Sequence, residues 1–132
     1  MEEKTVMDAL VQMKRTGNLL NELADLTQQL GQSIDRNDQV SIQLIIAMRE
    51  EPLAKLQAAD QALREQLEAL PDREEAGQLA AVLNGGPLAD GEGGALKMLS
   101  DQVAQNRRRL KQVMDLDRVL NQRMGREKSV YQ

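Results

Sequence analysis

The stretch NDQVSIQLIIAMREEPLAKL, residues 37–56, decides the fold, because it opens like a helix and keeps apolar residues at helical spacing. Asn37 or Asp38 offers a side-chain oxygen that can cap the free amides of a first helical turn. The apolar pattern continues to Leu70, where the proline that follows ends it. We therefore predict a long helix from about residue 38 to 70.

The first half of this helix carries more apolar residues than one-sided packing requires. On a helical wheel the apolar arc is about 200° wide, against about 100° for a helix packed on one side. The core stripe is Ile45, Met48, Leu56, Ala59, Leu63, Leu67 and Leu70, flanked by Ile42, Ile46 and Leu53 on one side and by Leu44 on the other. Since large apolar patches are uncommon on monomers, we expect two neighbours to sandwich the arc. The alternative is that the arc is partly exposed for a partner.

Pro52 and Arg49 lie inside this arc. Because proline has no amide hydrogen, the carbonyl of Met48 loses its helical partner, and we expect a kink or a restart of the helix at Pro52. For Arg49 we expect the aliphatic stem to lie on apolar surface, with the guanidinium in water or paired with Glu22 or Glu50. Direct contact of Arg49 with a partner is the alternative.

The flanking sequence predicts two more long helices and a short one, over residues 5–33, 72–84 and 95–124. The first carries Val6, Leu10, Met13, Gly17, Leu20, Leu23, Leu26, Thr27, Leu30 and Ile34 on one face, and the last carries Leu96, Leu99, Val103, Leu110, Val113, Leu116, Leu120 and Met124. Gly17 is expected to be simply tolerated, with a close helix crossing as the alternative. Gly125 is expected to end the last helix.

No strand pattern is present, so we predict an all-α fold. Three long helices and one short helix would form an elongated antiparallel bundle, a single domain of residues 1–132. A glycine-rich loop at 85–94 is expected to be flexible, and residues 125–132 are expected to form a polar tail.

Composition argues against catalysis. The 132 residues include no His and no Cys, which removes the side chains most used as general base, nucleophile and transition-metal ligand. The acidic run DGEGG at 90–94 lacks the alternating oxygen ligands of a calcium loop. We therefore expect a protein that is not an enzyme, with no cofactor and no metal. With no long apolar run and no leader pattern, we expect no membrane insertion and a cytoplasmic location.

The charge is unevenly distributed. Residues 1–95 hold 8 basic and 17 acidic side chains, whereas residues 96–132 hold 9 basic and 4 acidic ones. We expect the basic last helix to lie along acidic neighbours within one fold, with a basic handle for an acidic partner as the alternative. The densest basic cluster, Arg107–Arg109, is expected to be a solvated helix face, with nucleic-acid binding as the alternative. The chain is acidic overall and has a single aromatic residue, so we expect no nucleic-acid binding.

The stretch SIDRNDQVSIQLIIAMREEPLAKL, followed by a third long helix with QNRRRLKQVM, resembles the FlgN-type flagellar export chaperones. Asp38, Leu44, Met48, Arg49 and Leu53 fill the places comparable to the polar and apolar positions of that family's second helix. The resemblance covers roughly residues 5–124, and its motifs are mainly hydrophobic spacings.

This resemblance implies a cytoplasmic chaperone that keeps hook-associated subunits unassembled and delivers them to the flagellar export machinery. An amphipathic helix of the export client would then lie on an apolar helical surface. We place that surface at Ile42, Ile46, Arg49 and Leu53. The alternative is a non-catalytic structural coiled-coil protein that forms a homodimer through the same stripes and has no client.

Overall fold

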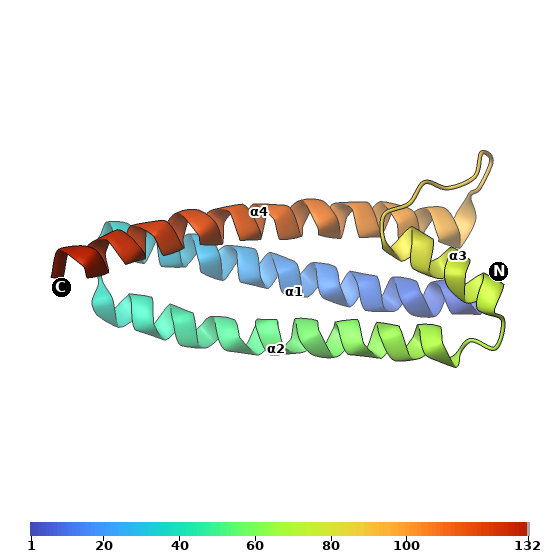
Figure 1. The fold of residues 1–132 in the computed structure, drawn as a ribbon, viewed down its shortest axis with the longest axis horizontal. Helices are drawn as coiled ribbons and strands as arrows, with labels where there is room; N and C mark the ends of the chain where they lie inside the picture. The colour runs from blue at the N-terminus through green and yellow to red at the C-terminus, as the bar shows by residue number, and fades with distance from the viewer. Residues whose placement is uncertain (132) are drawn as a thin grey trace.

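The computed structural model describes the backbone of residues 1–131 and the side chains of residues 1–125. The described chain is entirely helical and contains no strand, which confirms the predicted class. Its elements are α1 (Glu3–Asp35), α2 (Gln39–Ala69), α3 (Arg73–Leu83) and α4 (Gly94–Tyr131). Figure 1 shows the three long helices side by side, with α3 at the end where α1 and α4 begin.

The turn between α1 and α2 is tight because local side chains satisfy its amides. Asn37 adopts a left-handed conformation with φ of 55°, which Asn tolerates better than most residues. Asp38 then caps α2 as predicted, accepting hydrogen bonds from the Ser41 amide at 3.1 Å and the Ser41 hydroxyl at 2.7 Å. These two bonds favour the carboxylate and hold the pKa of Asp38 below its ordinary value.

Helix α1 is the central element. Both α2 and α4 pack along it, whereas α2 and α4 hardly approach each other. Asn106 of α4 donates to the Met13 carbonyl of α1, and further along Arg123 pairs with Asp35. The residue numbers of the contacting pairs thus rise together along α1 and α4. Helix α4 therefore runs parallel to α1 and antiparallel to α2.

The core consists of two clusters of buried side chains, one at each end of the long helices. The first is formed by Val6, Ala9, Leu10, Leu63, Leu79, Val82, Leu99 and Val103, and the second by Leu26, Leu30, Ile34, Ile42, Ile45 and Leu120. Most predicted stripe residues are buried, although some of these, such as Leu20, Leu23 and Val113, lie outside the two clusters. Met48 and Leu110 are not buried but exposed. Asn106, one turn before Leu110 on α4, is buried instead.

Helix α3 covers only one end of the space between α2 and α4. It contacts both of these helices and buries Ala76, Leu79 and Val82 against them. Asp72 caps its first turn by accepting from the amides of Glu74 and Glu75. With 11 residues against 31 in α2, α3 is too short to reach the turn between α1 and α2.

Three local predictions need correction. Gly125 does not end α4, which continues to Tyr131, because an interior glycine costs only about 1 kcal/mol and no proline follows it. The polar tail expected at 125–132 is therefore helical as far as the structure describes it. Pro52 does not restart α2 but lies fully buried within an unbroken helix. Gly17 marks a close approach: a Cβ there would lie 2.8 Å from the side chains of Asn106 and Gln102.

Candidate partner-binding surface

An ion pair between Arg49 of α2 and Asp117 of α4 bridges the two outer helices. Nη2 of Arg49 lies 2.7 Å from each carboxylate oxygen of Asp117. The Arg49 side chain is 15% exposed and the Asp117 side chain 32%. The partner of Arg49 is thus Asp117, and not Glu22 or Glu50, which the sequence suggested. The reason is that α4 brings a carboxylate to the face of α2 that the apolar arc occupies.

The neighbours of this ion pair on both helices are exposed and apolar. Ile46 and Leu53 stand three and four residues from Arg49, and are 40% and 43% exposed. Met114 and Leu110 stand three and seven residues from Asp117, and are 61% and 44% exposed. Residues at such spacings share a helix face, so the ion pair brings the two faces together. We call this surface the open seam: Ile46, Leu53, Leu110 and Met114 around the Arg49–Asp117 pair.

The predicted binding residues therefore divide into two groups. Ile46 and Leu53 are exposed, so for these two side chains the expected sandwich is wrong. Ile42 is only 5% exposed and packs in the second core cluster. The structure thus places Ile42 beneath the surface, where it supports the seam rather than facing a partner. Leu110 and Met114 also belong to the seam. Their helical spacing favours a place in the core, because the periodicity of one helix does not show which neighbouring helix is missing.

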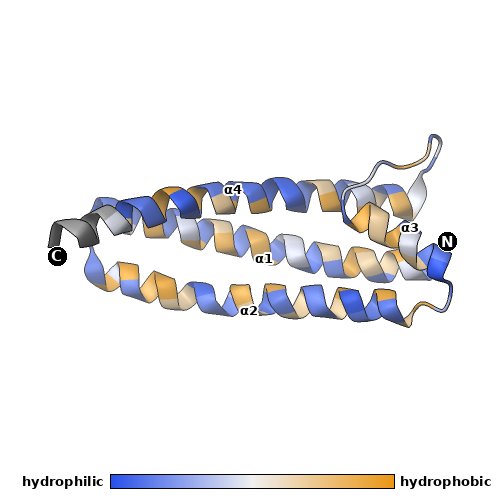
Figure 2. Cartoon of the chain, viewed as in Figure 1, coloured by the Kyte–Doolittle hydropathy of each residue, from blue (hydrophilic) through white to orange (hydrophobic). Residues whose placement is uncertain are grey.

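The open seam begins where α3 ends. The side chain of Arg107 lies against Gly85, just after the last turn of α3, where a Cβ would meet its Nε at 3.1 Å. From Arg107 to Arg123, the part of the space between α2 and α4 that α3 leaves uncovered extends for about 24 Å along α4, at 1.5 Å per residue. Figure 2 shows hydrophobic residues concentrated in the half of α2 that runs along this open part.

The opposite flank of α2 also carries exposed apolar side chains. Val40, Leu44 and Met48 are spaced four residues apart and lie on the solvent side of the helix. No charged bridge joins this flank to α4 among residues 1–125, and α1 exposes no large hydrophobic side chain between residues 12 and 35. The open seam is therefore the better candidate for a helix-binding surface.

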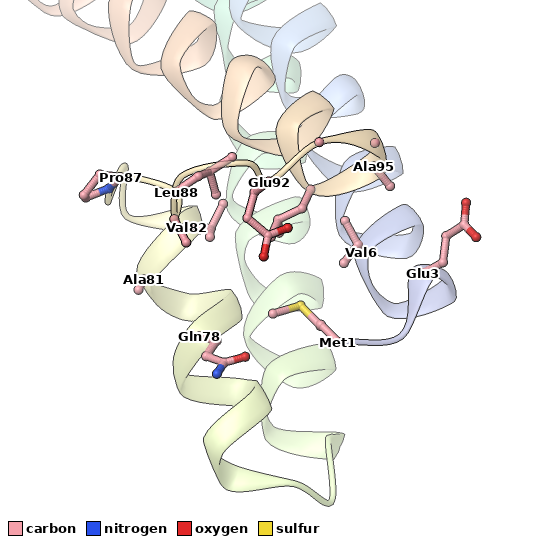
Figure 3. Close-up of a pocket in the computed structure, with 14 residues that line it drawn as sticks. Met1, Glu3, Val6, Gln78, Ala81, Val82, Pro87, Leu88, Glu92 and Ala95 are labelled. Carbon is pink, nitrogen blue, oxygen red and sulfur yellow. The ribbon is translucent and has the colours of Figure 1, made fainter.

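A separate hollow lies at the far end, beneath the loop that joins α3 to α4. Its volume is about 590 Å³, and its walls include Val6, Val82 and Leu96. Figure 3 shows Glu92 directed into the hollow from the loop and Glu3 directed away from it. The walls belong to α1, α3, α4 and the glycine-rich loop, but only one carboxylate, that of Glu92, enters the hollow. Nothing in this hollow selects a particular ligand.

Comparison of the chain with known protein families, with characterised proteins and with solved structures gives no match. Within the described residues, no helix combines the length and the apolarity that crossing a membrane requires. In the same part of the chain, no three carboxylates come together in a way that could hold a metal ion.

Proposed function

We propose that this protein binds an amphipathic helix of a protein partner in the open seam, as a non-catalytic chaperone. In this proposal the three long helices form an elongated bundle, and α3 with the partner helix together fill the position of a fourth helix. The specific form that the sequence resemblance favours is a cytoplasmic flagellar export chaperone, whose client is a helical segment of a hook-associated protein.

The observation that carries the proposal is the binding of α3 in the same groove. An amphipathic helix with Ala76, Leu79 and Val82 on one face already packs between α2 and α4 at one end. Beyond α3, the same two helices present four exposed apolar side chains to solvent. A second amphipathic helix placed in line with α3 would cover them, since a helix in such a groove is anchored by residues spaced three and four apart.

The first experiment compares Ile46→Asp with Ile42→Asp, one turn apart on the same helix. Ile46 is exposed, so the carboxylate stays in water and the melting temperature should change little. Ile42 is buried, so its replacement places an unpaired carboxylate in the core and should cost several kcal/mol. Circular dichroism melts measure both. A large loss in Ile46→Asp would show that the seam is closed and would refute the proposal.

The second experiment measures binding. Synthetic amphipathic helices from hook-associated proteins are titrated into the wild-type chain, Ile46→Asp and Leu44→Asp by calorimetry. We expect Ile46→Asp to lose binding and Leu44→Asp to retain it, because Leu44 lies on the opposite flank of α2. Sedimentation equilibrium tests the alternative: a homodimer that Ile46→Asp dissociates, together with no peptide binding, would favour a structural dimerisation protein.

A further inference from the structure

One edge of the open seam is basic. Arg107, Lys111 and Arg118 occupy the outer face of α4, immediately beside Leu110 and Met114 at helical spacing. All three side chains are exposed, and Arg118 lines a shallow hollow together with Met114 and Asp117. The α4 edge of the seam therefore carries a row of cations alongside its apolar residues.

The positive charge of this edge is only partly neutralised within the described chain. Lys111 pairs with Asp115 at 3.1 Å, and Arg118 lies 3.9 Å from the same carboxylate. No ion pair to Arg107 occurs among residues 1–125, although the side chain rests at the end of α3. Two of the three cations thus share one carboxylate and Arg107 has none, so a net positive charge remains along the α4 edge.

The α2 edge of the seam differs. Gln39, Glu50 and Gln57 occupy the outer face of α2, next to Ile46 and Leu53 at helical spacing, and all three are exposed. This edge carries one negative charge and two neutral amides. A helix lying in the seam would therefore meet cations on one flank and a weakly acidic surface on the other.

We propose that the partner helix is acidic on the flank that faces α4, with Asp or Glu residues opposite Arg107, Lys111 and Arg118. This inference rests on the proposed function, since it describes the helix that the seam would accept. Exposed ion pairs contribute little singly, but they set orientation and reject partners of the wrong charge. Arg107, Lys111 and Arg118 then act in selecting the client, and are not merely a solvated face.

The test uses three labelled peptides of about 16 residues, long enough to follow the open part of the seam at 1.5 Å per residue. They share one apolar stripe and carry Glu, Gln or Lys along one flank. Each peptide can lie in the seam in either chain direction, and one of these two directions places the varied flank against α4. Fluorescence anisotropy with the full chain gives the Kd of each peptide at low and at high salt.

We expect the Glu peptide to bind about tenfold more tightly than the Lys peptide at low salt, with a smaller difference at high salt. The double variant Arg107→Glu/Arg118→Glu should reverse this preference. The control Lys4→Glu/Lys14→Glu makes the same change of net charge on exposed positions of α1 and should keep it. Melting curves of both double variants confirm that they remain folded.

The other outcomes are distinguishable. Equal affinities for the three peptides, all lost in Ile46→Asp, would overturn this inference and leave the proposed function standing. No binding of any peptide by a folded wild-type chain would overturn both. A wild-type dimer that Arg107→Glu/Arg118→Glu dissociates, with no peptide binding, would show that a second copy of the chain occupies the seam.

Discussion

Substitution of Gly17 by alanine tests how closely α1 and α4 are fitted. In an exposed helix this change would stabilise the protein by about 1 kcal/mol, because glycine is a poor helix former. Here the new Cβ would lie 2.8 Å from Oδ1 of Asn106 and 2.8 Å from Nε2 of Gln102. Real Cβ contacts are longer than this, so the two side chains must move.

The movement disturbs a buried hydrogen-bond pair. Gln102 donates to Asn106 at 2.9 Å, and Asn106 donates to the Met13 carbonyl at 2.8 Å. Each bond contributes about 1 kcal/mol, and an amide left unsatisfied in the core costs about 1–3 kcal/mol more. Gln102 is half-buried and can rotate outward, but Asn106 is only 7% exposed and cannot reach water. When the gain in helix propensity is subtracted from this cost, Gly17→Ala should destabilise the protein by about 1–3 kcal/mol.

Gly77→Ala is the matched control. Gly77 lies in α3, is exposed, and has no atom within 4 Å of the position that a Cβ would take. It should therefore stabilise the chain by about 0.5–1 kcal/mol. Urea unfolding followed by far-UV circular dichroism measures both changes. If Gly17→Ala raises the stability as much as Gly77→Ala does, the close crossing of α1 and α4 does not exist.

Two further predictions concern polar groups. Asp117→Leu should cost about 1–3 kcal/mol, because the partly buried Arg49 loses its partner, whereas Arg49→Met/Asp117→Leu should lie within about 1 kcal/mol of wild type. Urea unfolding of Arg49→Met, Asp117→Leu and the double variant gives the coupling, and additive effects would contradict it. Since the pKa of Asp38 is lowered by Ser41, its contribution to stability is present above the ordinary value and lost as the pH falls through the folded-state pKa. The urea concentration at the midpoint of unfolding should therefore fall less for Asp38→Asn than for wild type as the pH goes from neutral to strongly acidic. Parallel plots of this midpoint against pH would argue against the cap.

Helix existence could be predicted from the sequence because each helix carries its own signals. The cap at Asp38, the stop at Leu70 and the stripe of α1 are local features, and the structure contains all of them. The end of α4 could not be predicted in this way. Gly125 resembles a stop signal, but glycine ends a helix only where the chain turns away, and nothing after it in the sequence forces that turn.

The candidate site could be predicted only in part, because exposure depends on which helix is absent. The wide arc indicated that α2 has neighbours on more than one side, and Ile46 and Leu53 were found from it. Whether that arc is covered depends on the length of α3 and on where its C-terminal end lies, which periodicity does not report. Leu110 was assigned to the core for the complementary reason: it falls on the apolar stripe of α4, but no helix of the described chain covers it.

The Arg49–Asp117 pair holds the two edges of the open seam together in the free chain. Nη2 of Arg49 donates to both carboxylate oxygens of Asp117, whereas its Nε is buried without a partner among the described residues. The four apolar seam residues are each roughly half exposed, so covering them fully would contribute on the order of 1 kcal/mol apiece. A total of about 4 kcal/mol is no larger than the entropy lost on association, so apolar contact alone gives weak binding. In the proposed complex, charge pairing along α4 would then decide which helices bind, and weak apolar contact would leave that binding reversible.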